Sequence, residues 1–233
     1  MEPLSAISLE ALRLLFTGDA ALWSIIAVSF SVSGTAILIA TPLALVLAFS
    51  LAYLRFPGRR ALITLANTLL SMPAVVVGLT LYLVLSRQGP LGDWHWLFTQ
   101  KAMILGQIVL CLPLMIAMGH AAFQAGDRRA WETALTLGVP PALAFFTVTR
   151  EARFALMAAL LAGFGRIIAE VGASMMLGGN ILAYTRNIPT AIALETSKGL
   201  FAQGIALGLV LLVMAFGLNA LLTWFQGQGE IRR

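Results

Sequence analysis

Apolar positions along the chain gather in long runs that contain no charged residue. Four such runs cover residues 20–54, 61–86, 102–126 and 199–229. A fifth apolar stretch, residues 154–177, is interrupted by Arg166 and Glu170. Each stretch is long enough to cross the hydrocarbon core of a bilayer, for which a helix needs about 20 residues. The runs do not alternate polar with apolar positions, as the strands of a membrane barrel do. The pattern therefore predicts an all-α membrane protein with five spanning helices, at about residues 20–54, 61–86, 102–126, 154–177 and 200–226.

The two ends of the chain flank these spans. In residues 1–19 the side chains of Leu4, Ile7, Ala11 and Leu14 share one face of a helix. This spacing predicts an amphipathic N-terminal segment that lies in the membrane interface. Residues 227–233 then form a short tail after the last span.

Basic residues predict the orientation of the spans. The loops at residues 55–60 and 127–153 and the tail hold nine Arg residues, whereas the loops on the opposite side and the N-terminal segment hold five Lys and Arg residues. Because cytoplasmic loops carry an excess of Lys and Arg, we expect the N-terminus outside and the C-terminus inside. An odd number of spans is consistent with termini on opposite sides.

The composition excludes a water-soluble globule. Of the 233 residues, 60% are hydrophobic and 11% are charged, whereas a soluble domain has about 25% charged residues. The net charge of +5 follows the loop distribution, so we interpret it as a topology signal and expect no binding to nucleic acid. The single cysteine, Cys111, excludes an internal disulfide.

The sequence lacks residue patterns typical of enzymes. It contains no G-x-x-x-x-G-K-S/T phosphate-binding loop. His95 and His120 do not have the spacing of metal ligands, and Glu170 is the only carboxylate within a predicted span. We therefore expect no catalytic residue, no metal and no cofactor in this chain.

The loop at residues 127–153 has the pattern of two short helices. Asp127 is positioned to cap the first helix, Gly138 to end it in the left-handed conformation, and Pro141 to begin the second. The first helix would expose large apolar side chains, Trp131, Leu135 and Leu137. Such a helix either docks a partner protein or only touches lipid, and the pattern leaves both alternatives open.

Part of this loop resembles a known family. Glu132, Thr133 and Ala134, followed by Gly138, resemble the EAA loop (E-A-A-x-x-x-G) of ABC-transporter permeases. An apolar residue ten positions after the glycine also fits, but Arg150-Glu151 stand where the pattern has Leu-Pro. In that family the loop forms coupling helices that sit in a groove of the ATPase subunit. The resemblance implies that ATPase coupling rests on the following residues: Trp131, Glu132, Ala134, Leu135 and Gly138.

Four further segments resemble the molybdate and tungstate permeases of this family. They are residues 71–79, 87–92, 165–180 and 190–199. The last segment, with the sequence TAIALETSKG, is closer to the tungstate branch than to the molybdate or sulfate branches. The resemblance extends from about residue 22 to residue 225.

This resemblance implies a permease subunit of an ATP-driven importer for tungstate or molybdate. The oxyanion would pass from an extracytoplasmic binding protein to the cytoplasm by alternating access. The implied assembly is a homodimer with two ATP-binding subunits in the inner membrane of a bacterium or archaeon, in contact with lipid. ATP and magnesium would belong to the ATPase subunits.

The two charges in the fourth predicted span indicate a functional position, because a charge inside a membrane is costly. Arg166 and Glu170 are four positions apart, so on one helix they would share a face and could form an ion pair. The pair is either structural or part of a gate, or else Arg166 contacts the passing oxyanion. The neighbours that complete this predicted gate and pathway are Gly172, Ser174 and Asn180.

Two other functions remain open from the residues alone. A secondary transporter driven by an ion gradient would use Glu170 as its ion site, but it would not need docking helices in its inner loop. A membrane scaffold would need neither a pathway nor coupling to ATP.

Overall fold

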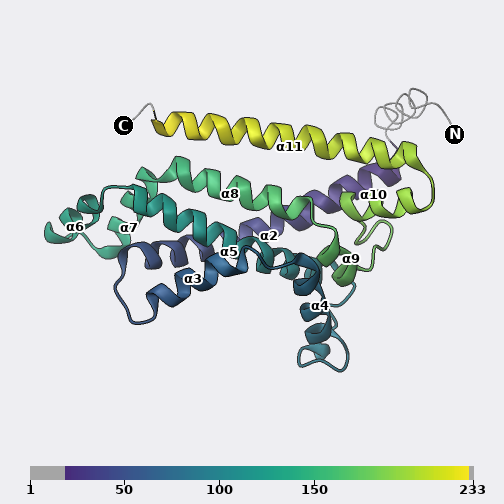
Figure 1. Cartoon of the computed structure of the whole chain (residues 1–233), viewed down its shortest axis with the longest axis horizontal. Helices are drawn as coiled ribbons and strands as arrows, with labels where there is room; N and C mark the ends of the chain where they lie inside the picture. Colours follow the sequence, from purple (N-terminus) through teal and green to yellow (C-terminus); the bar gives the residue numbers. More distant parts are fainter. Residues whose placement is uncertain (1–18, 231–233) are drawn as a thin grey trace. The chain divides into compact units, whose positions relative to one another are not determined.

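The apolar runs fold into helices. The computed structural model describes residues 19–230, so the predicted interfacial segment, apart from its last residue, and residues 231–233 of the tail lie outside the described part. In chain order the helices are α2 (Ala20–Tyr53), α3 (Arg59–Leu69), α4 (Ala74–Leu85), the short 3₁₀ helix η1 (Gly92–Trp94), α5 (Gln100–Ala125), α6 (Arg128–Thr136), α7 (Pro141–Glu151), α8 (Arg153–Ile168), α9 (Gly172–Gly178), α10 (Ile188–Ser197) and α11 (Phe201–Glu230) (Figure 1). Every regular element in residues 19–230 is helical, so the predicted all-α fold class is confirmed.

Three helices are long and apolar enough to cross a membrane, at Ala20–Tyr53, Gln100–Ala125 and Phe201–Leu221. Two further candidates are bent pairs: α3 with α4, which meet at 104°, and α8 with α9, which meet at 63°. The described residues thus hold three candidate spans, or five if each bent pair is one span. The predicted number of five spans thus agrees with the structure when each bent pair is one span, but the second and fourth spans are each built from two helices and not from one.

Local chemistry explains both breaks. Pro73 precedes α4 with extended backbone angles (φ −63°, ψ 130°), and a proline disfavours the helical conformation of the residue before it. At the second break α8 ends at Ile168, and the carboxylate of Glu170 accepts a hydrogen bond from the backbone N–H of Ala173 at 3.3 Å. This bond satisfies a donor at the start of α9 that has no partner within its own helix.

The helices form two compact units, each described here by itself. The first unit comprises Met1–Ala36, Pro73–Leu110 and Gly165–Gly217. Its core joins α2, α10 and α11 through a group of buried apolar side chains, Leu22, Ile25, Ile26, Ile188, Ala191, Ala206 and Leu207. Ser29 of α2 strengthens this contact, because its hydroxyl accepts a hydrogen bond from the backbone N–H of Ile188 at 2.7 Å.

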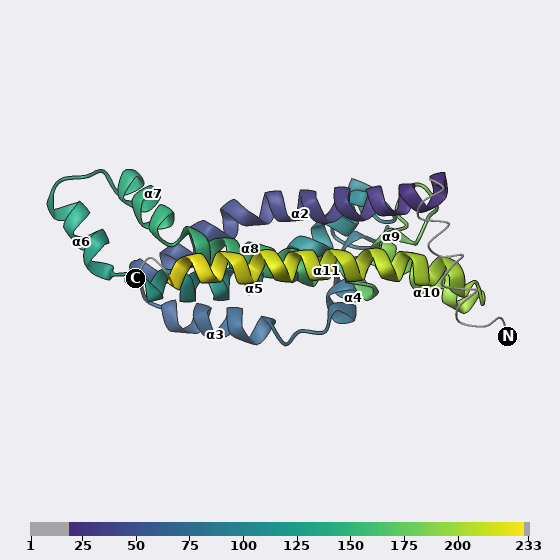
Figure 2. The same cartoon turned by 90° about the horizontal axis from the view of Figure 1, so that it is seen from above.

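Within the first unit α4 and α9 lie against each other with their backbones in close approach (Figures 1 and 2). A Cβ atom added to Gly78 would lie 2.8 Å from the Cα atom of Ala173, and one added to Gly172 would lie 2.8 Å from Cγ2 of Val75. Small residues permit such contact between helices in a membrane. The two short halves of the broken spans are therefore packed together through glycine and alanine.

The second unit comprises Ile37–Met72, Cys111–Phe164 and Leu218–Arg233. It holds α3, α6 and α7 together with later parts of α2 and α5 and most of α8. Helices α6 and α7 form a hairpin beyond the end of α5 (Figure 2).

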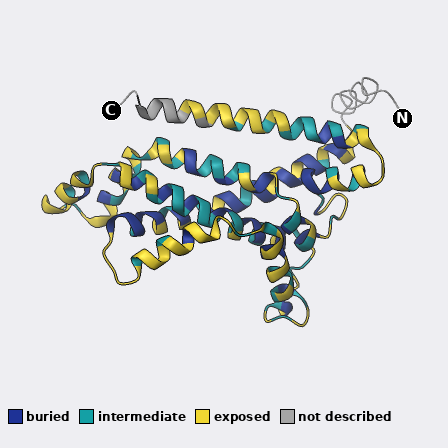
Figure 3. Cartoon of the chain, in the orientation of Figure 1, coloured by how far each residue is buried: buried dark blue, intermediate teal, exposed yellow. Residues whose placement is uncertain are grey.

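Large apolar side chains are exposed along the long helices of both units. Examples are Leu38 of α2 in the second unit, and Val213 and Phe216 of α11 in the first. Figure 3 shows exposed residues along much of α3 and α11. Soluble monomers rarely expose contiguous apolar surface on this scale, whereas membrane helices present such faces to lipid or to another helix.

Candidate functional site

The loop at residues 127–153 folds into the α6–α7 hairpin. The side chain of Asp127 accepts a hydrogen bond from the backbone N–H of Arg129 at 2.8 Å and so caps α6. Gly138 has a φ of +78°, in the left-handed region that favours glycine, and Pro141 begins α7. The predicted cap, stop and second start are confirmed.

Trp131 does not lie on the surface of this hairpin. Its side chain is 8% exposed and packs edge-on against Phe49 of α2, with ring centroids 5.0 Å apart. The prediction of an exposed tryptophan is wrong, because the ends of α2 and α5 supply an aromatic environment that the loop sequence does not reveal. The rings that form this aromatic cluster are Phe49, Tyr53, Phe123, Trp131 and Phe145.

The aromatic cluster connects the hairpin to two long helices of the second unit. Phe49 and Tyr53 belong to α2 and Phe123 to α5, whereas Trp131 and Phe145 belong to α6 and α7. Edge-to-face aromatic pairs contribute about 0.5–1.5 kcal/mol each beyond their buried area. A displacement of α6 is therefore resisted by, and transmitted to, the ends of α2 and α5.

The hairpin exposes four large apolar side chains among charged and polar ones. We define the hairpin surface as Leu135, Leu137, Leu143 and Phe146, all of them exposed. Leu137 is 77% exposed. Glu132 lies on the outside, where its carboxylate pairs with Arg128 at 3.0 Å, while Ala134 packs against the aromatic cluster. Of the five predicted coupling residues, Glu132 and Leu135 are thus available to a partner, whereas Trp131 and Ala134 face inward and Gly138 shapes the turn.

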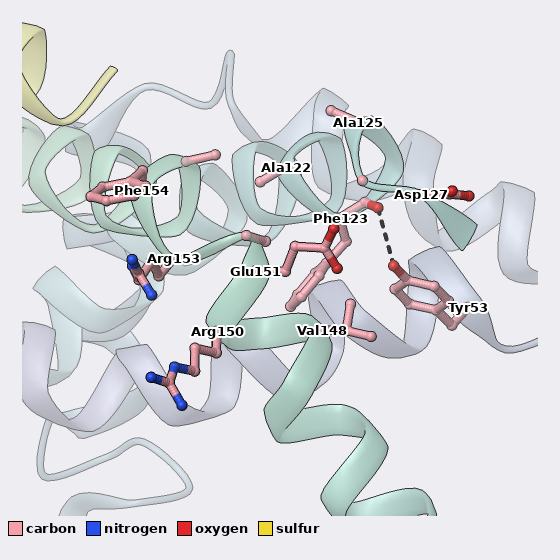
Figure 4. Close-up of a pocket in the computed structure, with 13 residues that line it drawn as sticks. Tyr53, Ala122, Phe123, Ala125, Asp127, Val148, Arg150, Glu151, Arg153 and Phe154 are labelled. Atoms are coloured by element: carbon pink, nitrogen blue, oxygen red, sulfur yellow. Dashed lines mark hydrogen bonds between the residues drawn. The ribbon is translucent and has the colours of Figure 1, made fainter. Parts of the chain in front are cut away.

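A cavity of about 550 Å³ lies beside the hairpin in the second unit (Figure 4). It is lined by the end of α5, the start of α6, the end of α7 and the start of α8. The hydroxyl of Tyr53 donates a hydrogen bond across one side of it to the carbonyl of Phe123 at 3.5 Å (Figure 4). Four charged side chains line it, those of Asp127, Arg150, Glu151 and Arg153.

The predicted gate residues lie in the first unit, at the break between α8 and α9. Arg166 is exposed on the last turn of α8, and Glu170 follows the end of that helix. Within residues 19–230 the two side chains form no ion pair, so the predicted Arg166–Glu170 pair is wrong. The reason is that α8 stops at Ile168, so the two residues do not share a helix face, and Glu170 binds the Ala173 N–H.

The other predicted pathway residues surround α9. Gly172 begins this helix against Val75, and Asn180 follows it in the left-handed conformation, with a φ of +53°. Ser174 is 2% exposed. In the described part of the chain the Ser174 hydroxyl and Oδ1 of Asn180 are buried without a hydrogen-bond partner.

Gln107 of α5 also has a buried polar atom without a hydrogen-bond partner within residues 19–230, and the sequence alone did not identify it as a candidate site residue. It is 2% exposed. Its Nε2 donates to the carbonyl of Ile167 at 3.4 Å, while its Oε1 has no partner among the described residues. The available signal was a long amide side chain in the middle of an apolar run.

Packing places Gln107 and Ser174 in the same part of the first unit. Gly106 of α5 would meet Leu177 of α9, and Met103 lies against Gly178. Ser174 precedes Leu177 by three residues and shares the buried face of α9. Gln107 of α5 and Ser174 of α9 thus each place inside the first unit a buried polar atom that has no hydrogen-bond partner among the described residues.

A third polar group lies around α10. The carboxylate of Glu195 is 3.1 Å from Nζ of Lys198 and 4.0 Å from Nη1 of Arg186. Arg186 also donates hydrogen bonds to the carbonyl of Asn180. These contacts fix the turn after α9 to α10.

Nowhere in residues 19–230 do three or more His, Cys, Asp or Glu side chains form a group that could hold a metal ion.

Several known permeases are similar to this chain in sequence. The tungstate uptake system permease protein TupB of Campylobacter jejuni is 42% identical over 210 residues, which are 90% of this chain and 88% of that protein. A probable anion ABC transporter permease protein of Haloferax volcanii is 40% identical over 203 residues, 85% of this chain and 88% of the relative. The molybdenum transport system permease protein ModB of Escherichia coli K12 is 30% identical over 178 residues, 73% of this chain and 78% of the relative.

A solved amino acid ABC transporter with bound histidines has the same fold, with a TM-score of 0.64 over 92% of this chain and 96% of that one. At 16% identity this likeness concerns the fold alone. No protein-family model matches the chain. The identity and coverage of the permease relatives show that this all-helical chain belongs to the ABC-transporter permeases, in the group of the tungstate and molybdate uptake systems.

Proposed function

We propose that this permease carries tungstate or molybdate into the cytoplasm, and that tungstate is its main substrate. The observation that carries the proposal is 42% identity, over nine-tenths of the chain, with a tungstate uptake permease. The identity with a molybdenum transport permease is lower, at 30%. A permease subunit of this family is not itself an ATPase and carries no cofactor, so ATP and magnesium belong to its ATPase partner.

The working assembly that we propose is a homodimer with two ATPase subunits and an extracytoplasmic binding protein. It lies in the inner membrane of a bacterium or archaeon, with the permease N-terminus outside and its C-terminus inside. The exposed apolar faces of α2 and α11 are surfaces that a second copy or lipid would cover. The basic loops then lie on the cytoplasmic side, as the positive-inside rule requires.

The hairpin surface is the proposed ATPase contact. Its four apolar side chains are exposed. In the proposed orientation the hairpin lies on the cytoplasmic side, outside the hydrocarbon core, so a partner protein would cover these side chains. Movement of the ATPase subunits would displace α6, and the aromatic cluster would pass this displacement to α2 and α5. ATP binding would thereby turn the pathway outward, and hydrolysis would reset it.

The pathway that we propose passes the broken spans of the first unit. The neutral groups there that can donate a hydrogen bond to an oxyanion are the Ser174 hydroxyl and the side-chain amide N–H groups of Gln107 and Asn180. Glu170 and Gly172 shape the break. A conduit must bind its ion weakly enough to release it. Neutral donors satisfy a dianion less strongly than arginines would, so such a site favours passage over retention. Arg166, exposed on α8, is the one cation that we include in the gate.

Uptake by the reconstituted complex tests the function. Proteoliposomes containing the permease, its ATPase and its binding protein should import tungstate only with ATP. Unlabelled tungstate should compete better than molybdate, and sulfate least. Uptake that persists without ATP would support the gradient-driven alternative.

A second variant tests the hairpin surface. Leu137→Asp places a charge on an exposed side chain, so the permease should fold normally and lose most of its ATPase binding. The matched control is Thr136→Asp, which adds the same charge at the neighbouring exposed residue of α6, where the side chain is already polar. This variant should keep its ATPase binding. Full ATPase binding by Leu137→Asp would remove the hairpin surface from the coupling contact.

A further inference from the structure

The cavity beside the hairpin lies where three membrane helices end. Tyr53 is the last residue of α2, Ala125 is the last residue of α5, and Arg153 is the first residue of α8; all three line the cavity. Helix ends of this kind lie at the level of the lipid headgroups. The volume of about 550 Å³ is within the range of about 300–1,000 Å³ that small-molecule sites occupy.

The charges that line this cavity are separated. In Figure 4 the guanidinium groups of Arg150 and Arg153 lie on one side, Asp127 and Tyr53 lie on the other, and Glu151 lies between them. Two positive and two negative charges make the lining neutral as a whole.

The cavity also has apolar walls. Phe154 lies beside Arg153, with the guanidinium 4.8 Å from the centre of its ring. Ala122 and Ala155, from α5 and α8, line the cavity as well. A ligand that fits all of these groups has an anionic part, a cationic part and an apolar part.

We propose that this cavity binds the headgroup of a phosphatidylethanolamine molecule. The phosphate would accept hydrogen bonds from Arg150 and Arg153, and the ammonium would donate to Glu151 and to the carboxylate oxygen of Asp127 that does not cap α6. The glycerol and the first acyl carbons would lie against Phe154 and the two alanines. A phosphatidylglycerol headgroup lacks the cation that the carboxylates require, and a choline headgroup has no N–H donor.

This site is independent of the transported anion, and it explains a departure from the EAA pattern. Arg150 and Glu151 stand where that pattern has Leu-Pro. The two residues sit at the end of α7, so a bound lipid would join α7 and α8 to the membrane surface next to the hairpin.

Lipid retention by the full-length permease tests the proposal. The chain would be placed in nanodiscs of phosphatidylcholine alone, or with added phosphatidylethanolamine or phosphatidylglycerol. Native mass spectrometry would count the retained lipids, and the thermal unfolding midpoint would be measured in each. We expect phosphatidylethanolamine to be retained and to raise the midpoint, and the other two lipids to do neither.

Variants assign the roles of the two charge pairs. Arg150→Gln with Arg153→Gln should reduce phosphatidylethanolamine retention by about tenfold or more, the effect of losing charged hydrogen bonds. Glu151→Gln should remove the preference over phosphatidylcholine. Arg60→Gln, which changes an exposed arginine of α3 outside the cavity, is the matched control and should retain the lipid as the unaltered chain does.

Three results would overturn the proposal. They are equal retention of phosphatidylcholine and phosphatidylethanolamine by the unaltered chain, full retention by the double arginine variant, and displacement of the lipid by free phosphate or tungstate. The last result would assign the arginines to a free oxyanion. Because Glu151→Gln changes one exposed side chain, it keeps the test decisive even if the double variant does not fold.

Discussion

Trp131 of α6, together with Phe145 of α7, holds the hairpin to the membrane helices. It contacts Phe49 at 5.0 Å and Tyr53 at 5.6 Å between ring centroids. In the proposed coupling, its burial means that Trp131 would carry the displacement of α6 and would not itself contact the ATPase.

Removal of this ring should therefore separate transport from ATP hydrolysis. Trp131→Ala leaves a cavity in the aromatic cluster and should destabilise the fold by about 3–5 kcal/mol. Trp131→Phe retains a ring and should lose much less. Thermal unfolding, together with the number of oxyanions imported per ATP hydrolysed, measures both effects. If Trp131→Ala kept the normal ratio, α6 would act on the spans by another contact.

Gln107 tests whether the buried polar atoms serve the pathway. Gln107→Leu removes the unpaired Oε1, and the Ile167 carbonyl keeps its bond from the Glu170 N–H at 3.2 Å. The free energy of unfolding should thus change by no more than about 1 kcal/mol. Tungstate uptake should fall about tenfold or more, because the variant also lacks the Nε2 donor, which in our proposal turns from the Ile167 carbonyl to the passing oxyanion. Val109→Leu, on an exposed face of α5, is the control. Normal uptake by Gln107→Leu would place the pathway elsewhere.

At the scale of elements, the broken spans depend on the contact of α4 with α9. Pro73 and the Glu170–Ala173 hydrogen bond set where the second halves begin. Gly78 then allows the backbones to meet, since a Cβ there would approach the Cα atom of Ala173 to 2.8 Å.

Gly78→Ala should therefore force the two helices apart. Overpacking of this kind destabilises by about 1–3 kcal/mol, which a lower unfolding midpoint in detergent would reveal. Gly208→Ala is the matched control, because Gly208 lies in α11 and has no heavy atom within 4 Å of an added Cβ. That change should be neutral or stabilise α11 by about 1 kcal/mol or less. Equal midpoints for the two variants would contradict the close approach of α4 and α9.

At the scale of the whole molecule, the orientation in the membrane is open to a direct test. The chain has one cysteine, Cys111, so Cys111→Ala provides a background for single labelling sites. A membrane-impermeant maleimide applied to intact cells should label Trp94→Cys, in the predicted outer loop, and should not label Arg129→Cys until the cells are opened. The positive-inside distribution of the loops is the reason for this expectation. The reverse labelling pattern would invert the proposed topology.

Several features of this protein follow from local sequence alone. Charge-free runs longer than a bilayer require membrane helices, because unpaired backbone groups cannot face lipid. Asp127, Gly138 and Pro141 act through backbone geometry within a few residues, so they locate α6 and α7 without reference to the rest of the chain. The EAA-like residues of the same loop and the segments around α4, α9 and α10 carried the family resemblance.

Other features depend on contacts between residues far apart in the chain. The burial of Trp131 depends on rings from α2, α5 and α7. The break between α8 and α9 contains no proline that would have predicted it from the sequence. The spacing of Arg166 and Glu170 predicted an ion pair only on the assumption of an unbroken helix. The sequence by itself thus determined membrane insertion, the hairpin and the family. Tertiary structure alone decided which side chain is covered and where charges meet, because packing brings together residues that lie far apart along the chain.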